Sequence, residues 1–189
     1  MILRLEPGDL SLATLDRLDV DSLAAFVGPE RPLTGLAGLV DWRLCGAVSR
    51  SILAGTFAPE KGDVLLLPSG GRFPTPRVFC FGHSDGGDAA LAAGARWACG
   101  VLAKAGAQSV AAALPAGPSA AGLVRALVRA SGEAGFSRLA LLGDGRALAK
   151  DAEAAVREVG VEAEVVPFHS RTEPPPPAAS LPGRGPVVR

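Results

Sequence analysis

The chain has 189 residues, of which 48% are hydrophobic and 20% are charged. This length accommodates one domain with a sizeable core, and the hydrophobic fraction indicates a folded chain rather than a disordered one. Nineteen basic residues balance 19 acidic ones, so no net charge attracts nucleic acid or an anionic membrane, and nucleic-acid binding is disfavoured. Tyrosine is absent, which excludes a tyrosyl general acid or base.

The expected location is the cytoplasm. The N-terminus lacks the long apolar segment of a secretion signal, and Arg96 and Lys104 interrupt the most apolar stretch, so no membrane span is expected. The three cysteines are far apart and have no CxxC spacing, which suits neither a disulfide framework nor a zinc site. We predict that Cys45, Cys80 and Cys99 are buried thiols.

Short apolar runs alternate with helical periodicity along residues 1–169. This alternation predicts an α/β fold, a three-layer α/β/α sandwich whose mixed, mostly parallel sheet is covered by helices on both faces. Residues 170–189 contain six prolines and almost no large apolar side chains, so we predict a flexible, proline-rich tail there. The predicted strands are residues 2–5, 22–27, 64–67, 78–81, 110–114, 139–142 and 161–168, and the predicted helices are residues 36–54, 88–105, 119–131 and 147–159.

The first predicted helix has one apolar face, because Leu44, Val48 and Ile52 recur every four residues. Thr34 is its expected N-cap and Gly55 its expected stop.

Ligands of such sheets bind beyond the carboxyl ends of the strands, where glycine-containing loops lead into helix N-termini. Each such loop taken alone is typical of a turn or a cap, and residues 143–145 suit an ordinary strand-to-helix turn. His83 and His169 are the only imidazoles, and neither has a metal-ligand spacing. We expect His83 to be solvated or hydrogen-bonded in its loop. No catalytic residue, metal site or cofactor is predicted. The glycine-containing loops are residues 33–38, 82–87, 115–119 and 143–145.

Five segments in order carry a family resemblance. Residues 32–44, 53–57, 61–63, 65–68 and 77–82 closely resemble the N-terminal domain of the M17 leucyl aminopeptidases. That domain is macro-domain-like, which agrees with the α/β/α prediction. The family's catalytic domain, with its two-metal site and catalytic lysine, has no counterpart among these residues. The resemblance therefore implies a protein that is not an enzyme by itself.

The macro-domain comparison implies candidate ligand-binding residues. Asp21 would stand where ADP-ribose binders recognise adenine. In place of the binders' asparagine-rich strand end the chain has residues 26–30, which removes amide contacts to the distal ribose. In the two phosphate-binding loops the candidate residues are Thr34, Gly35, Gly38, Gly117 and Ser119.

Two hypotheses of different classes follow. The first is a non-catalytic, stand-alone relative of the M17 N-terminal domain that acts as a protein-interaction or regulatory module, with itself or with a separate M17 peptidase chain as its partner. The alternative is a macro-like module that binds a nucleotide or ADP-ribose derivative at the strand ends. A hydrolase acting in the same cleft is a third, weaker hypothesis.

Overall fold

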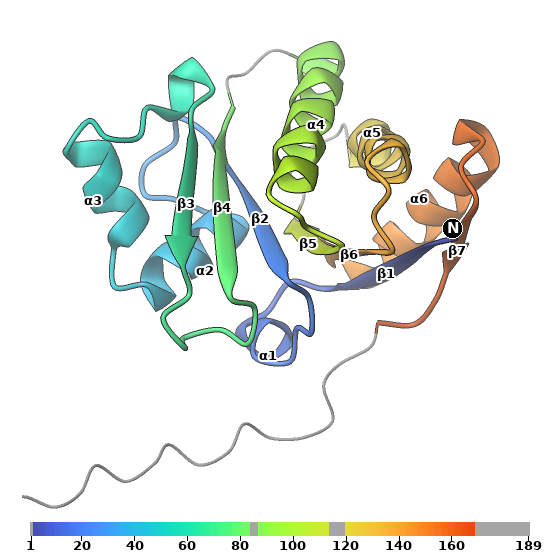
Figure 1. Ribbon diagram of the computed structural model, residues 1–189, viewed down its shortest axis with the longest axis horizontal. Helices are drawn as coiled ribbons and strands as arrows, with labels where there is room; N and C mark the ends of the chain where they lie inside the picture. Colours follow the sequence, from blue (N-terminus) through green and yellow to red (C-terminus); the bar gives the residue numbers. More distant parts are fainter. Residues whose placement is uncertain (1, 84–86, 114–119, 169–189) are drawn as a thin grey trace, which may run out of the picture.

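Seven strands and six α-helices are found in the described part of the computed structural model, which comprises residues 2–83, 87–113 and 120–168 (Figure 1). A 3₁₀ turn, η1 (Pro59–Lys61), precedes the third strand. The strands are β1 (Leu3–Asp9), β2 (Ser22–Val27), β3 (Val64–Pro68), β4 (Arg77–Gly82), β5 (Ser109–Ala113), β6 (Arg138–Gly143) and β7 (Ala163–Val165). The helices are α1 (Leu12–Leu15), α2 (Gly35–Arg43), α3 (Ala47–Leu53), α4 (Gly87–Lys104), α5 (Ala120–Glu133) and α6 (Gly145–Val159).

The strands form one sheet in the order β3-β4-β2-β5-β6-β1-β7. All neighbouring pairs are parallel except β3 with β4. The carboxyl ends of β1, β2, β4, β5 and β6 consequently meet at one edge of the sheet, called the carboxyl edge below, and the loops that follow these strands gather there.

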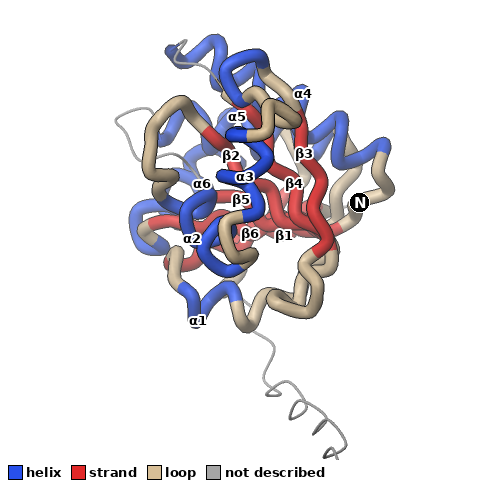
Figure 2. The backbone as a smooth tube through the Cα atoms, turned by 90° about the vertical axis from the view of Figure 1, so that its left-hand side faces the viewer, coloured by secondary structure: helices blue, strands red, loops and turns tan. Residues whose placement is uncertain are grey.

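Two hydrophobic cores lie on opposite faces of the sheet, as successive strand residues require. Phe79 and Phe81 of β4 pack into the core beneath α4, α5 and α6, whereas Val78 and Cys80 pack into the core beneath α1, α2 and α3. Figure 2 shows the strands of the sheet and the surrounding helices from a second direction. The predicted three-layer α/β/α sandwich with a mixed, mostly parallel sheet is therefore confirmed.

Every predicted strand overlaps an observed one, and β1 is longer than predicted. Its extra residues include Pro7, which cannot donate a backbone hydrogen bond. Because β7 pairs only with Leu3–Leu5, one side of β1 is open beyond Leu5, and the strand tolerates a proline there. Leu114, the predicted end of β5, and the predicted tail at residues 170–189 lie outside the described residues.

The prediction of one helix over residues 36–54 is wrong, because α2 and α3 are separate. Cys45 and Gly46 have φ angles of 55° and 79°, and two successive left-handed residues end a right-handed helix. The apolar periodicity nevertheless continues across the break, since Val48 of α3 is fully buried in the same core as α2. Gly55 follows the end of α3, as predicted.

No helix in the described ranges is both long enough and apolar enough to span a bilayer.

Candidate functional site

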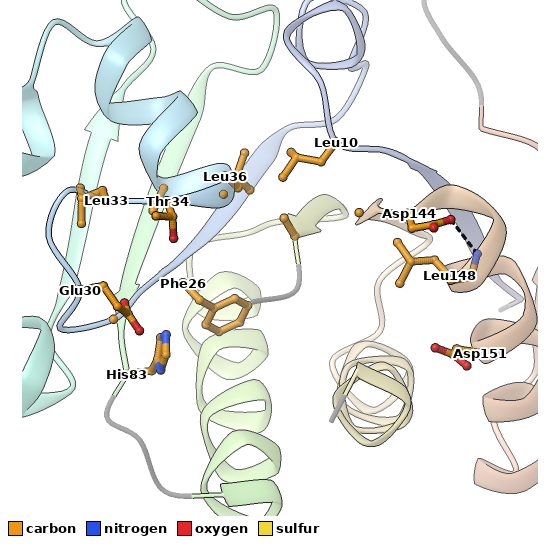
Figure 3. Close-up of a pocket in the computed structure, with 16 residues that line it drawn as sticks. Leu10, Phe26, Glu30, Leu33, Thr34, Leu36, His83, Asp144, Leu148 and Asp151 are labelled. Carbon is orange, nitrogen blue, oxygen red and sulfur yellow. Dashed lines mark hydrogen bonds between the residues drawn. The ribbon is translucent and has the colours of Figure 1, made fainter. Parts of the chain in front are cut away.

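A cavity of about 560 Å³ opens at the carboxyl edge of the sheet (Figure 3). It lies between the segments that follow β1, β2, β4 and β6, with the first turns of α2 and α6 on its two sides. Its volume falls within the range of small-molecule sites. Apolar side chains supply much of the lining: Leu10, Phe26, Leu33, Leu36, Ala37, Ala113, Ala147 and Leu148.

The start of α2 forms one side of the cavity. Thr34 and Gly35, two predicted ligand-binding residues, line it. Thr34 occupies the N-cap position, but its hydroxyl makes no capping hydrogen bond, so the first backbone N–H groups of α2 have no side-chain acceptor. Gly38, a third predicted residue, does not line the cavity. Its lack of a side chain lets the backbone of α2 lie close to the Leu33 carbonyl oxygen, because a Cβ built at Gly38 would come within 2.4 Å of that oxygen.

The start of α6 forms the opposite side. Asp144 is its N-cap, and its Oδ1 accepts a hydrogen bond from the Ala147 backbone N–H at 3.0 Å. The Gly145 N–H donates to Oδ1 of Asp9, the last residue of β1, at 2.9 Å. Residues 143–145 are thus the predicted strand-to-helix turn, and Gly143 and Asp144 also line the cavity. Asp9 was missed because the predicted strand ended at residue 5.

Glu30 and His83 belong to the same end of the cavity as Thr34 (Figure 3). The His83 backbone N–H donates to the Val27 carbonyl at 3.0 Å, which fixes it beside the end of β2. The predicted solvation or hydrogen bonding of the imidazole is wrong for one nitrogen, because Nδ1 is buried and has no hydrogen-bond partner.

The charged side chains that line the cavity are acidic. Among the described residues that line it, the charged side chains are Glu30, Asp144 and Asp151, and none is a lysine or an arginine.

Asp21 lies away from this cavity, which corrects its predicted role in adenine recognition. It directly precedes β2 and therefore lies at the amino edge of the sheet, whereas the cavity is at the carboxyl edge. Its carboxylate accepts hydrogen bonds from Arg77 Nη2 at 2.9 Å and from the backbone N–H groups of Gln108 and Ser109 at 2.8 and 2.9 Å. Asp21 therefore joins the starts of β2, β4 and β5.

Gly117 and Ser119, the predicted residues of the second phosphate loop, lie outside the described residues.

The cysteines are not part of the cavity lining. Cys80 and Cys99 are buried, as predicted, and burial raises the pKa of the Cys80 thiol to about 12 and that of the Cys99 thiol to about 11. The prediction that Cys45 is buried is wrong: it lies in the turn between α2 and α3 and is exposed. Within residues 2–83, 87–113 and 120–168, no three His, Cys, Asp or Glu side chains form a group that could hold a metal ion.

No family model matches the chain, and no curated protein matches its sequence. Solved structures do share its fold. A tomato leucine aminopeptidase mutant is 17% identical with a TM-score of 0.58 over 81% of this chain, which spans only 35% of the aminopeptidase. The macrodomain of Mycobacterium tuberculosis DarG is 17% identical with a TM-score of 0.57 over 74% of this chain and 97% of its own.

A Trypanosoma brucei macrodomain solved in complex with ADP-ribose is 14% identical, with a TM-score of 0.61 over 82% of this chain and 68% of its own. Identities this low establish the fold alone. The chain has a macrodomain-like fold, which it shares with a leucine aminopeptidase.

Proposed function

We propose that the chain binds a nucleoside diphosphate of the ADP-ribose type in the cavity at the carboxyl edge. The observation that carries this proposal is the position of the α2 N-terminus, which borders the cavity without a capping side chain. A macrodomain with the same fold has been solved in complex with ADP-ribose, which supports the choice of ligand class.

The diphosphate would lie at the start of α2. The first N–H groups of a helix have no intrahelical partner, and the helix dipole places about half a positive charge there. Gly35, Leu36 and Ala37 are the first three helical residues, and all three line the cavity. Backbone N–H groups in this arrangement bind phosphate without a lysine or an arginine.

The nucleoside would occupy the apolar part of the cavity. Phe26, Leu10 and Leu148 offer flat or branched apolar surface on which a base can be buried. Asp151 of α6 supplies a carboxylate that can accept hydrogen bonds from an exocyclic amine or a sugar hydroxyl.

Calorimetric titration of the full chain with ADP-ribose tests the proposal. We expect saturable binding to the wild type, and loss of binding in Ala147→Trp, because the indole would fill the cavity. Lys150→Trp is the matched control, since Lys150 is exposed on the same helix and does not line the cavity. Absence of binding to the wild type, or unchanged binding to Ala147→Trp, would contradict the proposal.

A protein-interaction role, the first hypothesis from the sequence, is the second candidate. Val64 and Leu66 of β3 are 42% and 53% exposed, and Trp97 of α4 is 40% exposed. Val64 and Leu66 pair with Phe81 and Phe79 of β4, so their side chains lie on the face of the sheet that α4 covers. We call these three exposed residues the β3 strip, and Figure 1 shows no helix in front of β3.

The β3 strip has the composition of a contact surface, with large apolar and aromatic side chains beside an open strand edge. Its partner would be a second copy of the chain or a separate M17 peptidase chain. Size-exclusion chromatography with light scattering, with and without such a peptidase, tests this role. We expect an assembly that Leu66→Lys abolishes and that Leu53→Lys, an 86% exposed position on α3, leaves intact. A persistent monomer that binds no peptidase chain would contradict it.

We further propose that the described part of the chain binds its ligand and does not hydrolyse aminopeptidase substrates. A leucine p-nitroanilide assay with added Zn²⁺ or Mn²⁺ should give no turnover above the buffer rate, and metal-dependent turnover would overturn this proposal.

A further inference from the structure

The open edge of β3 carries backbone groups that no other strand in the described ranges satisfies. β3 ends the sheet and pairs with β4 alone. The Gly82 N–H donates to the Asp63 carbonyl at 2.8 Å, directly before the first residue of β3. Because backbone groups alternate in direction along an antiparallel strand, every second residue from Asp63 bonds to β4. Val64, Leu66 and Pro68 therefore direct their backbone groups to the open side of the sheet.

This edge has little of the protection that isolates the end strand of a sheet. Edge strands are usually short, charged, bulged or covered, which prevents pairing with another chain. β3 contains no charged residue, and its one protective residue is Pro68, the last of the strand. Val64 and Leu66 can each donate and accept hydrogen bonds at the open side. The edge can therefore bind one added strand over these residues, as in recognition by β-strand addition.

A second copy of β3 matches these backbone groups. A two-fold axis always places a strand antiparallel to its own copy. An axis at Leu65 sets Val64 of each copy opposite Leu66 of the other, and each pair exchanges both of its hydrogen bonds. An axis at Leu66 would instead set Val64 opposite Pro68, which has no N–H, and would leave the Val64 carbonyls without a donor. The axis at Leu65 is therefore the better register.

The side chains of the β3 strip suit the same pairing. Val64 and Leu66 lie on the face of the sheet that α4 covers, so the pairing brings the apolar side chains of the two copies together. Trp97 lies beside Val64, because its ring is 5.4 Å from that of Phe81, the β4 partner of Val64. The strip thus continues from one copy to the other.

The charges at the two ends of β3 are also complementary. Residues 60–63, directly before the strand, carry two acidic side chains and one basic side chain, and Arg72 is the one charged residue of the loop at residues 69–76. Antiparallel pairing brings the start of one β3 beside the end of the other. Opposite net charges consequently meet at both ends of the contact, which favours this orientation over a parallel one.

We propose that two copies of the chain associate through β3, antiparallel about Leu65, so that their sheets join into one continuous sheet. This inference rests on the protein-interaction role proposed above as the second candidate function, and it names the partner and the bonds within that role.

Analytical ultracentrifugation of the full chain tests the contribution of the backbone. Val64→Pro should raise the dissociation constant of the dimer at least about 30-fold, because one N–H donor is lost from each copy. The Val64 N–H points away from β4, so a proline at this first strand position suits the fold of the single chain, and circular dichroism checks that fold. Val64→Thr is the matched control. It keeps the N–H and the branched shape, and it should remain dimeric at the concentration where Val64→Pro is monomeric.

Mild oxidation tests the register. In the proposed pairing, the Cα atoms of Val64 and of Leu66 in the second copy lie about 5.5 Å apart, a separation that a disulfide spans. An equimolar mixture of Val64→Cys and Leu66→Cys chains should therefore give a disulfide-linked dimer, and either variant alone should give far less. Both variants carry Cys45→Ser, which removes the exposed native thiol.

The outcomes separate this inference from the role on which it rests. A dimer that Val64→Pro leaves intact, or a disulfide that forms better in one variant alone than in the mixture, would overturn the inference and leave the interaction role standing. A wild-type monomer that binds a separate M17 peptidase chain would do the same. A wild-type monomer that binds no such chain would overturn both.

Discussion

At the scale of single residues, the Asp21 carboxylate has a structural role, and it acts in its charged form. Burial raises its pKa, but hydrogen bonds from Ser22, Gln108 and Ser109 outweigh burial and hold the pKa below the usual value of an aspartate. The charged form is therefore the one that the fold stabilises. Its contribution is present above the pKa of the unfolded chain, about 3.9, and is lost as the pH falls through the lower pKa of the folded chain.

Asp21→Asn should consequently destabilise the protein by about 1–3 kcal/mol at neutral pH, because the amide cannot satisfy the same donors. The difference between the variant and the wild type should shrink when urea unfolding is repeated near about pH 3. Asp19→Asn, an exposed position nearby, is the control. A difference that stays constant between the two pH values would show that the charge of Asp21 does not matter.

The three thiols should differ in reactivity, since the thiolate is the reactive form and burial disfavours it. Titration of the native protein with a thiol reagent such as dithiobisnitrobenzoate should modify Cys45 rapidly, and Cys80 and Cys99 only at the rate of unfolding. All three should react at once in denaturant. Rapid modification of Cys80 or Cys99 in the native protein would contradict their burial.

At the scale of elements, the side chain of Asp41 bridges the break between α2 and α3. Asp41 of α2 accepts hydrogen bonds from the backbone N–H of Ser49 at 3.0 Å and from its hydroxyl at 2.6 Å. It thereby does for α3 what an N-cap side chain does, while Gly46 occupies the N-cap position itself. Asp41→Ala should cost about 1 kcal/mol of unfolding free energy, as the loss of an N-cap does. Asp19→Ala is the control for urea unfolding, and an equal effect of both changes would contradict the capping role.

This break also shows why the sequence predicted some elements and missed others. Strands and helices with a regular apolar period were found, because burial on one face imposes that period. The period continues through Leu44, Val48 and Ile52 although the backbone turns between α2 and α3, since both helices cover the same core. The spacing of apolar residues indicates which face of a helix is buried, but it does not indicate where φ becomes positive for one or two residues.

At the scale of the whole molecule, the sheet separates two cores that should respond independently to mutation. Val48 of α3 and Val128 of α5 are both fully buried, on opposite faces. Val48→Ala and Val128→Ala should each cost about 2 kcal/mol, and the double variant should show the sum to within about 0.5 kcal/mol. Urea unfolding measures all three, and a coupling well above that margin would contradict the separation.

The location of the site was predictable in part from the order of residues and strands. In a parallel sheet, a residue that follows a strand lies at the carboxyl edge and one that precedes it lies at the amino edge. Thr34 and Gly35 come from a loop predicted at the carboxyl edge and line the cavity. Asp21 precedes its strand, so this rule alone argues against the role assigned to it. The position of Glu30 depends on packing against Gly28, which no pattern in a single sequence reveals.

The close approach at Gly38 limits how the cavity can be redesigned. Any side chain there would meet the Leu33 carbonyl and push the first turn of α2 outward, together with the N–H groups that border the cavity. A library aimed at new ligands should therefore vary Ala113, Ala147 and Asp151, which line the cavity, and keep residue 38 as glycine. Substitution of these lining residues can then change the ligand specificity, while the backbone that would bind the phosphates keeps its conformation.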